Sequence, residues 1–323
     1  MITSVVRKFI AHAEKIEPGP MIDPQSRWIH ALLFGWLALF LIAFFRSDFF
    51  IGDKLAVKTF LFAAWIMLNG CLLRRYGHGK IARFLEGISI VVMAVLLSLG
   101  SVPLLASWSG PFADNALVKL DAMFGFDWRD AARFYASHPG FVALSEASYN
   151  SFAIQMLVIP PFLFLWRGGE RAWNYLLAYL LTTLLTLAVF PFFPPVGPYI
   201  HFGVARDAIP GIGNTFPHGW QWKFGGWISE FQQGQNRDLA KAFSGLVSIP
   251  SYHAAMGVLF IWNCKGVRFL WWPLVALNMT MIGSALVSGS HYLIDLIAGV
   301  GVAAIGICAA KSILDRAPSR PPP

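Results

Sequence analysis

Long apolar stretches recur along this chain of 323 residues, and short polar segments separate them. A helix that crosses a bilayer needs about 20 predominantly apolar residues. On that rule the sequence predicts about eight membrane-spanning helices, with the sixth the shortest, at residues 28–45, 55–73, 87–106, 144–166, 173–194, 250–264, 268–287 and 290–310. The pattern therefore predicts an all-α fold, a polytopic membrane helix bundle.

The composition agrees with this prediction, since 56% of the residues are hydrophobic and only 13% are charged. The net charge is +8, but the basic residues are scattered over short loops and form no patch with interleaved aromatic residues. We therefore expect no nucleic-acid partner. The first 27 residues contain several acidic and proline residues and no apolar core, so we expect no cleavable signal peptide.

The distribution of lysine and arginine predicts the topology. These residues gather before the first stretch, after the second, fourth and eighth, and between the sixth and seventh. Loops rich in lysine and arginine stay in the cytoplasm, so we expect an inner-membrane protein with both termini cytoplasmic. Loops 46–54, 107–143 and 195–249 would then be extracytoplasmic.

Two of these extracytoplasmic loops have a character of their own. Residues 112–137 alternate apolar and charged residues with helical spacing, which predicts an amphipathic helix in the membrane interface. Loop 195–249 is longer than ordinary connections, and such loops are more often functional than simple spacers.

Two histidines stand at the starts of apolar stretches on the same predicted side of the membrane. His253 ends the sequence Pro250-Ser251-Tyr252-His253, and His291 is followed four residues later by Asp295. On a helix this spacing places His291 and Asp295 on one face, so the carboxylate can hold one ring nitrogen while the other points outward. A histidine held in this way can act as a nucleophile or a base. A proline and a serine at the start of a helix leave backbone N–H groups free to bind an anion. Together these features suggest phosphate chemistry at a membrane surface.

The motif Pro250-Ser251-x-His253, followed by His291-x-x-x-Asp295, resembles the second and third signature motifs of the type 2 phosphatidic acid phosphatase superfamily. Phe193-Pro194-Pro195-Val196-Gly197-Pro198-Tyr199 and the His291-Tyr292-x-x-Asp295 form resemble the branch that contains the fungal inositol phosphorylceramide synthases. The resemblance implies a phosphatase-like membrane domain at 111–312, in the C-terminal two-thirds, which follows the N-terminal transmembrane helices at 1–110. The proline-rich composition of the C-terminal end predicts a disordered tail at 313–323.

The resemblance implies a phosphohistidine mechanism that needs no metal and no cofactor. His291 would attack phosphorus, Asp295 would orient its ring, and His253 would protonate the leaving oxygen. The substrate would be a membrane lipid phosphate or phosphodiester, bound at the extracytoplasmic face. Water as acceptor gives a phosphatase and a lipid hydroxyl gives a phosphotransferase, and the motifs do not separate the two. The residues expected to bind the substrate are Ser248, Pro250, Ser251, Tyr199, Arg206 and Arg237.

The sequence departs from the superfamily at one position that matters for phosphate binding. The third motif usually has Ser-Arg seven and six residues before the nucleophile, and here those positions are Ser284 and Ala285. The arginine is missing, so we expect a cation from loop 195–249 to replace it. Arg206 and Arg237 are the favoured candidates.

Two functions of other classes remain open at this stage. A bis-histidine haem protein would use His253 and His291 as axial ligands, but it leaves Ser251 and Asp295 unexplained. An anion transporter would place polar residues near the bilayer midplane, whereas the polar residues of this chain gather at one face of the membrane. Within the fourth stretch, Tyr149, Asn150 and Gln155 either line a substrate cavity or form hydrogen bonds between helices.

Overall fold

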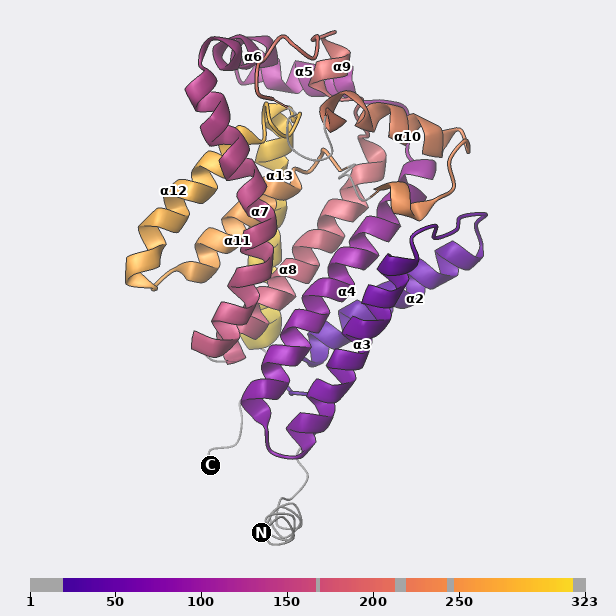
Figure 1. Cartoon of the computed structure of the whole chain (residues 1–323), viewed down its shortest axis with the longest axis vertical. Helices are drawn as coiled ribbons and strands as arrows, with labels where there is room; N and C mark the ends of the chain where they lie inside the picture. The colour runs from indigo at the N-terminus through magenta and orange to yellow at the C-terminus, as the bar shows by residue number, and fades with distance from the viewer. Residues whose placement is uncertain (1–19, 167–168, 213–218, 243–246, 316–323) are drawn as a thin grey trace, which may run out of the picture.

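The computed structural model describes residues 20–166, 169–212, 219–242 and 247–315, and its regular structure is almost entirely helical (Figure 1). Each predicted apolar stretch forms a helix. These helices are α2 (Arg27–Phe45), α3 (Lys54–Arg75), α4 (Gly79–Ser107), α7 (Pro139–Trp166), α8 (Gly169–Val189), α11 (Tyr252–Cys264), α12 (Arg268–Ser284) and α13 (Leu293–Asp315). The prediction of a polytopic helix bundle is confirmed.

Six of the described helices are long and apolar enough to cross a membrane, so this is an integral membrane protein. The other two, α11 with 13 residues and α12 with 17, are shorter. They pack against each other as a hairpin along one side of the bundle (Figure 1). Helix α13 continues to Asp315, so residues 313–315, which the sequence placed in a disordered tail, are helical. The rest of that predicted tail lies outside the described residues.

Helix α8 lies at the centre of the bundle, where it packs against α4, α7, α11 and α13. Its side chains are correspondingly buried, and the large side chains of Trp173, Tyr175 and Tyr179 are each at most 1% exposed. By contrast, large apolar side chains on α3 such as Leu61, at 62%, are exposed. Exposed apolar surface of this kind is expected where a helix faces lipid.

One end of the bundle is held by a buried ion network. The Arg74 guanidinium donates to Asp23 at 2.9 Å and to Glu86 at 2.8 Å, and all three side chains are at most 8% exposed. The network joins the segment before α2 to α3 and α4.

Short helices gather at the opposite end of the bundle (Figure 1). We call α5 (Asp114–Met123), α6 (Trp128–Ser137), α9 (Pro198–His201) and α10 (Phe224–Gln232) the cover helices. The described residues also form the 3₁₀ turns η1 (Phe190–Phe192), η2 (Trp220–Trp222) and η3 (Leu239–Ala242).

The prediction of a single amphipathic helix over residues 112–137 is wrong, because the segment forms α5 and α6 with a turn between them. Gly125 takes φ +69°, a left-handed conformation that ends α5. Asp127 then caps α6, its side chain accepting a hydrogen bond from the Arg129 backbone N–H at 2.9 Å.

Candidate active site

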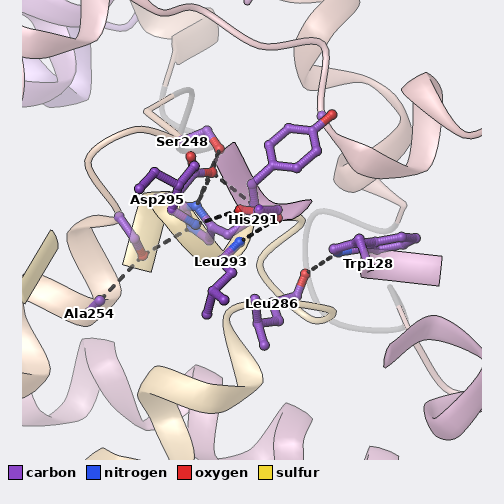
Figure 2. Close-up of polar contacts among 12 residues, drawn as sticks. Trp128, Ser248, Ala254, Leu286, His291, Leu293 and Asp295 are labelled. Atoms are coloured by element: carbon purple, nitrogen blue, oxygen red, sulfur yellow. Dashed lines mark hydrogen bonds and ion pairs between the residues drawn. The ribbon is translucent and has the colours of Figure 1, made fainter. Parts of the chain in front are cut away.

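His291 lies in the turn that connects α12 to α13. The sequence predicted that His291 and Asp295 share a helix, and this is wrong for His291, because α13 begins only at Leu293. Ser290, directly before it, has φ +55°, which is uncommon for a residue that carries a Cβ. Such strained conformations cluster at functional sites. The side chains of His291 and Asp295 still meet, with Nδ1 3.3 Å from Oδ2 (Figure 2).

The Asp295 carboxylate is fully buried and held in a fixed orientation. Its Oδ2 accepts hydrogen bonds from the Ser248 hydroxyl at 2.7 Å and from the Tyr292 backbone N–H at 3.0 Å. The second bond is the one that an acidic residue in the first turn of a helix makes to the capping residue. The start of α13 therefore aims one carboxylate oxygen at the His291 ring.

The His291 imidazole has partners on both ring nitrogens. Nδ1 lies 3.2 Å from the Ser248 hydroxyl as well as near Asp295, and Nε2 lies 3.4 Å from the Ser251 hydroxyl. A carboxylate beside Nδ1 favours the tautomer with its proton there, which leaves the lone pair on Nε2. Nε2 is thus the ring atom available for a nucleophilic role.

The second histidine, His253, is in the first turn of α11. Its half-buried ring stacks on Tyr149, with centroids 3.9 Å apart, and lies 4.5 Å from the Phe152 ring. Ser251 caps α11, and its side chain accepts from the Ala254 backbone N–H. In the described part of the chain, the backbone N–H groups of Tyr252 and His253 have no hydrogen-bond partner, as is usual in a first helical turn.

Both histidines line one cavity of about 650 Å³. Tyr149, Asn150 and Ser248 line it as well. Gln155, the third polar residue of the fourth predicted stretch, instead accepts a hydrogen bond from Asn278 at 2.8 Å and so joins α7 to α12. Of the two alternatives left open for this stretch, lining a cavity applies to Tyr149 and Asn150, and hydrogen bonding between helices applies to Gln155.

Tyr199, expected to bind substrate, has another role in this structure. It is fully buried, and its hydroxyl donates to the Val287 carbonyl at 3.1 Å. Trp128 donates to the neighbouring Leu286 carbonyl at 2.9 Å (Figure 2), and Gln221 donates to a third carbonyl of the same turn at 3.0 Å. Buried backbone carbonyls need such donors because the turn has no regular helix to satisfy them. These side chains hold the turn that carries His291.

The sequence reasoning did not single out Asp114 on α5. Its carboxylate is 4% exposed and accepts from the backbone N–H groups of Val196 at 2.8 Å and Gly197 at 3.0 Å, and from the Tyr292 hydroxyl at 2.7 Å. Gly197 has φ +92°, and any side chain there would run into Phe224. Burial, and next the Asp114 charge, raise the pKa of Tyr292 above its ordinary value, so the hydroxyl stays protonated and donates.

Asp121, also on α5, fixes the first turn of α13. It accepts from the backbone N–H groups of Leu293 at 3.0 Å and Ile294 at 2.8 Å. Burial raises the pKa of Asp121, although both backbone bonds act in the opposite direction. Asp114, Leu117 and Asp121 share one face of α5 by their helical spacing, and all three are buried. The signal in the sequence that could have indicated these buried aspartates was the presence of two acidic residues and a leucine on one face of a helix.

The geometry agrees with a comparison against protein families, which matches residues 115–309 to the PAP2 superfamily. The chain belongs to the PAP2 superfamily. His253, His291 and Asp295 all lie within the matched region, and membership supports a phosphatase-like, lipid-related enzyme. No curated protein and no solved structure matches the chain. The resemblance is thus confirmed for the superfamily, and its inositol phosphorylceramide synthase branch stays a prediction.

In this PAP2 superfamily member, neither arginine favoured by the sequence reaches the cavity. Arg206 is exposed, and the Arg237 guanidinium packs over the Phe49 ring at 5.0 Å, beside the connection from α2 to α3. None of the described residues that line the cavity is a lysine or an arginine. The expectation that one of the two arginines replaces the missing cation is therefore not met.

The other expected phosphate ligands lie close to His291, but on different sides of it. Pro250 directly precedes the capping residue Ser251, rather than taking the first helical position. Ser248 contacts the Asp295 side of the imidazole, whereas Ser251 contacts the Nε2 side. Ser248 also lines the cavity, whereas the fully buried Ser251 is not among its lining residues.

Proposed function

We propose that this protein transfers the phosphoryl group of a membrane lipid phosphate through a phosphohistidine formed on His291. The observation that carries the proposal is the orientation of the imidazole. Asp295 and Ser248 hold Nδ1, while Nε2 faces Ser251 next to the cavity that also contains His253. A covalent intermediate divides one difficult displacement into two easier ones.

In the first step, Nε2 of His291 attacks phosphorus, and the bond from phosphorus to the lipid oxygen breaks. Protonated His253 gives its proton to the departing oxygen, which leaves as an alcohol. The Asp295 carboxylate stabilises the positive charge that develops on the His291 ring.

In the second step, water or an acceptor hydroxyl attacks the phosphohistidine. His253, now neutral, takes the proton of the attacking oxygen, and the bond from phosphorus to Nε2 breaks. Both residues return to their starting states. From a lipid phosphomonoester, water gives inorganic phosphate and a lipid hydroxyl gives a new lipid phosphomonoester. From a lipid phosphodiester, water gives the phosphomonoester of the head group and a lipid hydroxyl gives a new lipid phosphodiester.

The phosphoryl oxygens need fixed donors, and the first turn of α11 supplies them. The N–H groups of Tyr252 and His253, which have no hydrogen-bond partner among the described residues, stand beside the Ser251 hydroxyl at a helix N-terminus, which favours anions. Fixed donors at the equatorial oxygens stabilise the transition state of phosphoryl transfer. The negative charge of a bound phosphate favours the protonated form of His253. In that form His253 and these donors take over part of the role of the arginine absent at Ala285.

We further propose that the reaction occurs at the extracytoplasmic face, where the distribution of lysine and arginine places loop 195–249. Membership in the PAP2 superfamily supports phosphoryl chemistry over the haem and transporter alternatives. The branch resemblance favours transfer to a lipid hydroxyl such as that of ceramide or diacylglycerol. Following free phosphate release against transfer of a labelled head group distinguishes hydrolysis from transfer.

The decisive experiment compares His291→Ala with Asp295→Asn after brief incubation with a radiolabelled lipid phosphate. The wild type should carry an acid-labile, base-stable label, and His291→Ala should carry none. Asp295→Asn should keep reduced labelling and residual turnover, because the imidazole is present but poorly oriented. Equal labelling of the wild type and His291→Ala would refute the assignment.

The role of His253 is tested by changing the leaving group. A general acid matters only where the departing oxygen needs a proton in the transition state. His253→Ala should therefore slow a lipid alkyl phosphate by about 100-fold or more, and a nitrophenyl phosphate much less. Identical losses on both substrates would mean that His253 binds phosphate rather than donating a proton.

A further inference from the structure

The cavity that contains the two histidines extends well beyond them, into the membrane-spanning part of the bundle. Apart from Thr59, Ser98, Thr183 and Thr186, its lining away from the histidines is almost entirely apolar. Helix α4 contributes the largest share of this apolar wall. Its lining residues are Val91, Val92, Val95, Leu96, Ser98, Leu99 and Val102.

Helix α4 lies outside the region that matches the PAP2 superfamily, which begins at residue 115. The reacting groups of this cavity therefore come from the matched region, and much of its apolar wall comes from a helix that precedes it. The site would be incomplete on the α4 side without this N-terminal helix.

The cavity also opens toward the lipid side of the bundle. Asn150, Ala153 and Leu157 line it from α7, all three are exposed, and Leu157 is 69% exposed. Their spacing places them in one stripe along α7. Because α7 is one of the helices long and apolar enough to cross a membrane, this stripe faces the bilayer.

The length of the wall fits one hydrocarbon chain. Val91 and Val102 lie eleven positions apart on α4, which corresponds to about 16 Å at ~1.5 Å per residue. One leaflet of a bilayer has a hydrocarbon thickness of about 15 Å, half of the ~30 Å core. A volume of about 650 Å³ is within the ordinary range of sites for small ligands.

We propose that this cavity binds one hydrocarbon chain of the lipid phosphate, and that α4 makes the enzyme select long-chain over short-chain phosphates. The chain enters through the α7 stripe, and the phosphate reaches His291 while any second chain stays in the bilayer. The proposal rests on the proposed function for the chemistry at the phosphate, but the binding of the chain is tested separately.

The first test compares butyl phosphate with dodecyl phosphate as substrates. Val95→Trp fills the cavity from α4, and Val158→Trp is the matched control, because Val158 lies on the exposed face of α7 outside the lining. Each methylene kept out of an apolar site costs about 0.8 kcal/mol. Val95→Trp should lower the ratio of the two kcat/KM values, dodecyl over butyl, about tenfold, whereas Val158→Trp should leave it at the wild-type value. An unchanged ratio in Val95→Trp would overturn the proposal.

The second test does not depend on turnover. His291→Ala is incubated with an alkyl phosphate that carries a photoreactive diazirine at the end of its chain, and the labelled peptides are identified. The label should map to α4, and Val95→Trp introduced into the same background should reduce it. Label confined to exposed faces of α2 and α3 would refute the chain site. If the chain site is right and the proposed chemistry is wrong, labelling persists while the wild type forms no phosphohistidine.

Discussion

Replacing Asp114 by asparagine tests whether α5 positions the catalytic turn. The asparagine oxygen can still accept from Gly197 and Tyr292, but its NH₂ group then faces the Val196 N–H, so a donor meets a donor. A hydrogen bond to a charged group contributes about 1.5–3 kcal/mol, and a buried donor left without a partner costs about 1–3 kcal/mol. We expect a loss of about 3 kcal/mol in the free energy of unfolding.

The partner of Asp114 allows a sharper measurement. Tyr292→Phe removes the hydroxyl that donates to Asp114 at 2.7 Å and leaves the ring in place. A hydrogen bond to a neutral acceptor contributes ~1 kcal/mol less than one to a carboxylate. A double-mutant cycle of Asp114→Asn and Tyr292→Phe should therefore give a coupling energy of about 1 kcal/mol.

The assay measures denaturation in detergent and turnover at a temperature well below the Tm of every variant. Tyr292 is next to His291, so loosening it should lower kcat about tenfold, since small displacements of a catalytic group are costly. Asp130→Asn is the control, because Asp130 is an exposed acidic residue on α6. A variant with a lower Tm but wild-type kcat would refute the positioning role of Asp114.

Three further predictions follow from contacts elsewhere. Ser248→Ala should lower kcat about tenfold with little change in KM, because Ser248 donates to Asp295 rather than to the substrate. A rise in KM with little change in kcat, measured by steady-state kinetics, would instead place Ser248 at the substrate. Arg74→Ala should destabilise the protein by about 3–5 kcal/mol, because it leaves two buried carboxylates unpaired, whereas the exposed Arg75→Ala should be nearly neutral in the same denaturation assay. Arg206→Lys and Arg237→Lys should each keep more than about half of the wild-type kcat/KM, because Arg206 is exposed and Arg237 packs over Phe49. A severe loss of kcat/KM in either variant, as expected for the loss of a bidentate phosphate contact, would place that arginine at the substrate.

The sequence predicted the helices well because each is a long apolar stretch, and that signal is local. It also brought His253, His291 and Asp295 into one region, since motif and topology agree there. It could not place His291 in the turn before α13, because a spacing of four residues fits a helix and also fits a turn that leads into one. The mistake over residues 112–137 has a similar origin, since Gly125 and Asp127 interrupt a pattern whose helical spacing continues on both sides.

The roles of Tyr199 and of the arginines could not be read from the sequence, because they depend on contacts between distant segments. Tyr199 bonds to Val287, 88 positions further along the chain. Arg237 packs against Phe49, on the connection between α2 and α3. Tyr199, Arg206 and Arg237 were favoured as phosphate ligands because they lie near a motif along the chain. Only the packing of the described helices reveals what each side chain contacts.

Because Asp114 and Asp121 of α5 each bind a different segment of the chain, the number of residues between them is constrained. Asp114 and Asp121 are seven positions apart, about two turns or ~10 Å, and this interval spans the distance from the segment at Val196 to the first turn of α13. One residue inserted between them would rotate Asp121 by about 100° relative to Asp114, so only one of the two carboxylates could reach its partners. Homologous proteins that keep this arrangement should therefore keep the number of residues between these aspartates and an apolar residue at the position of buried Leu117, while the exposed positions between them vary.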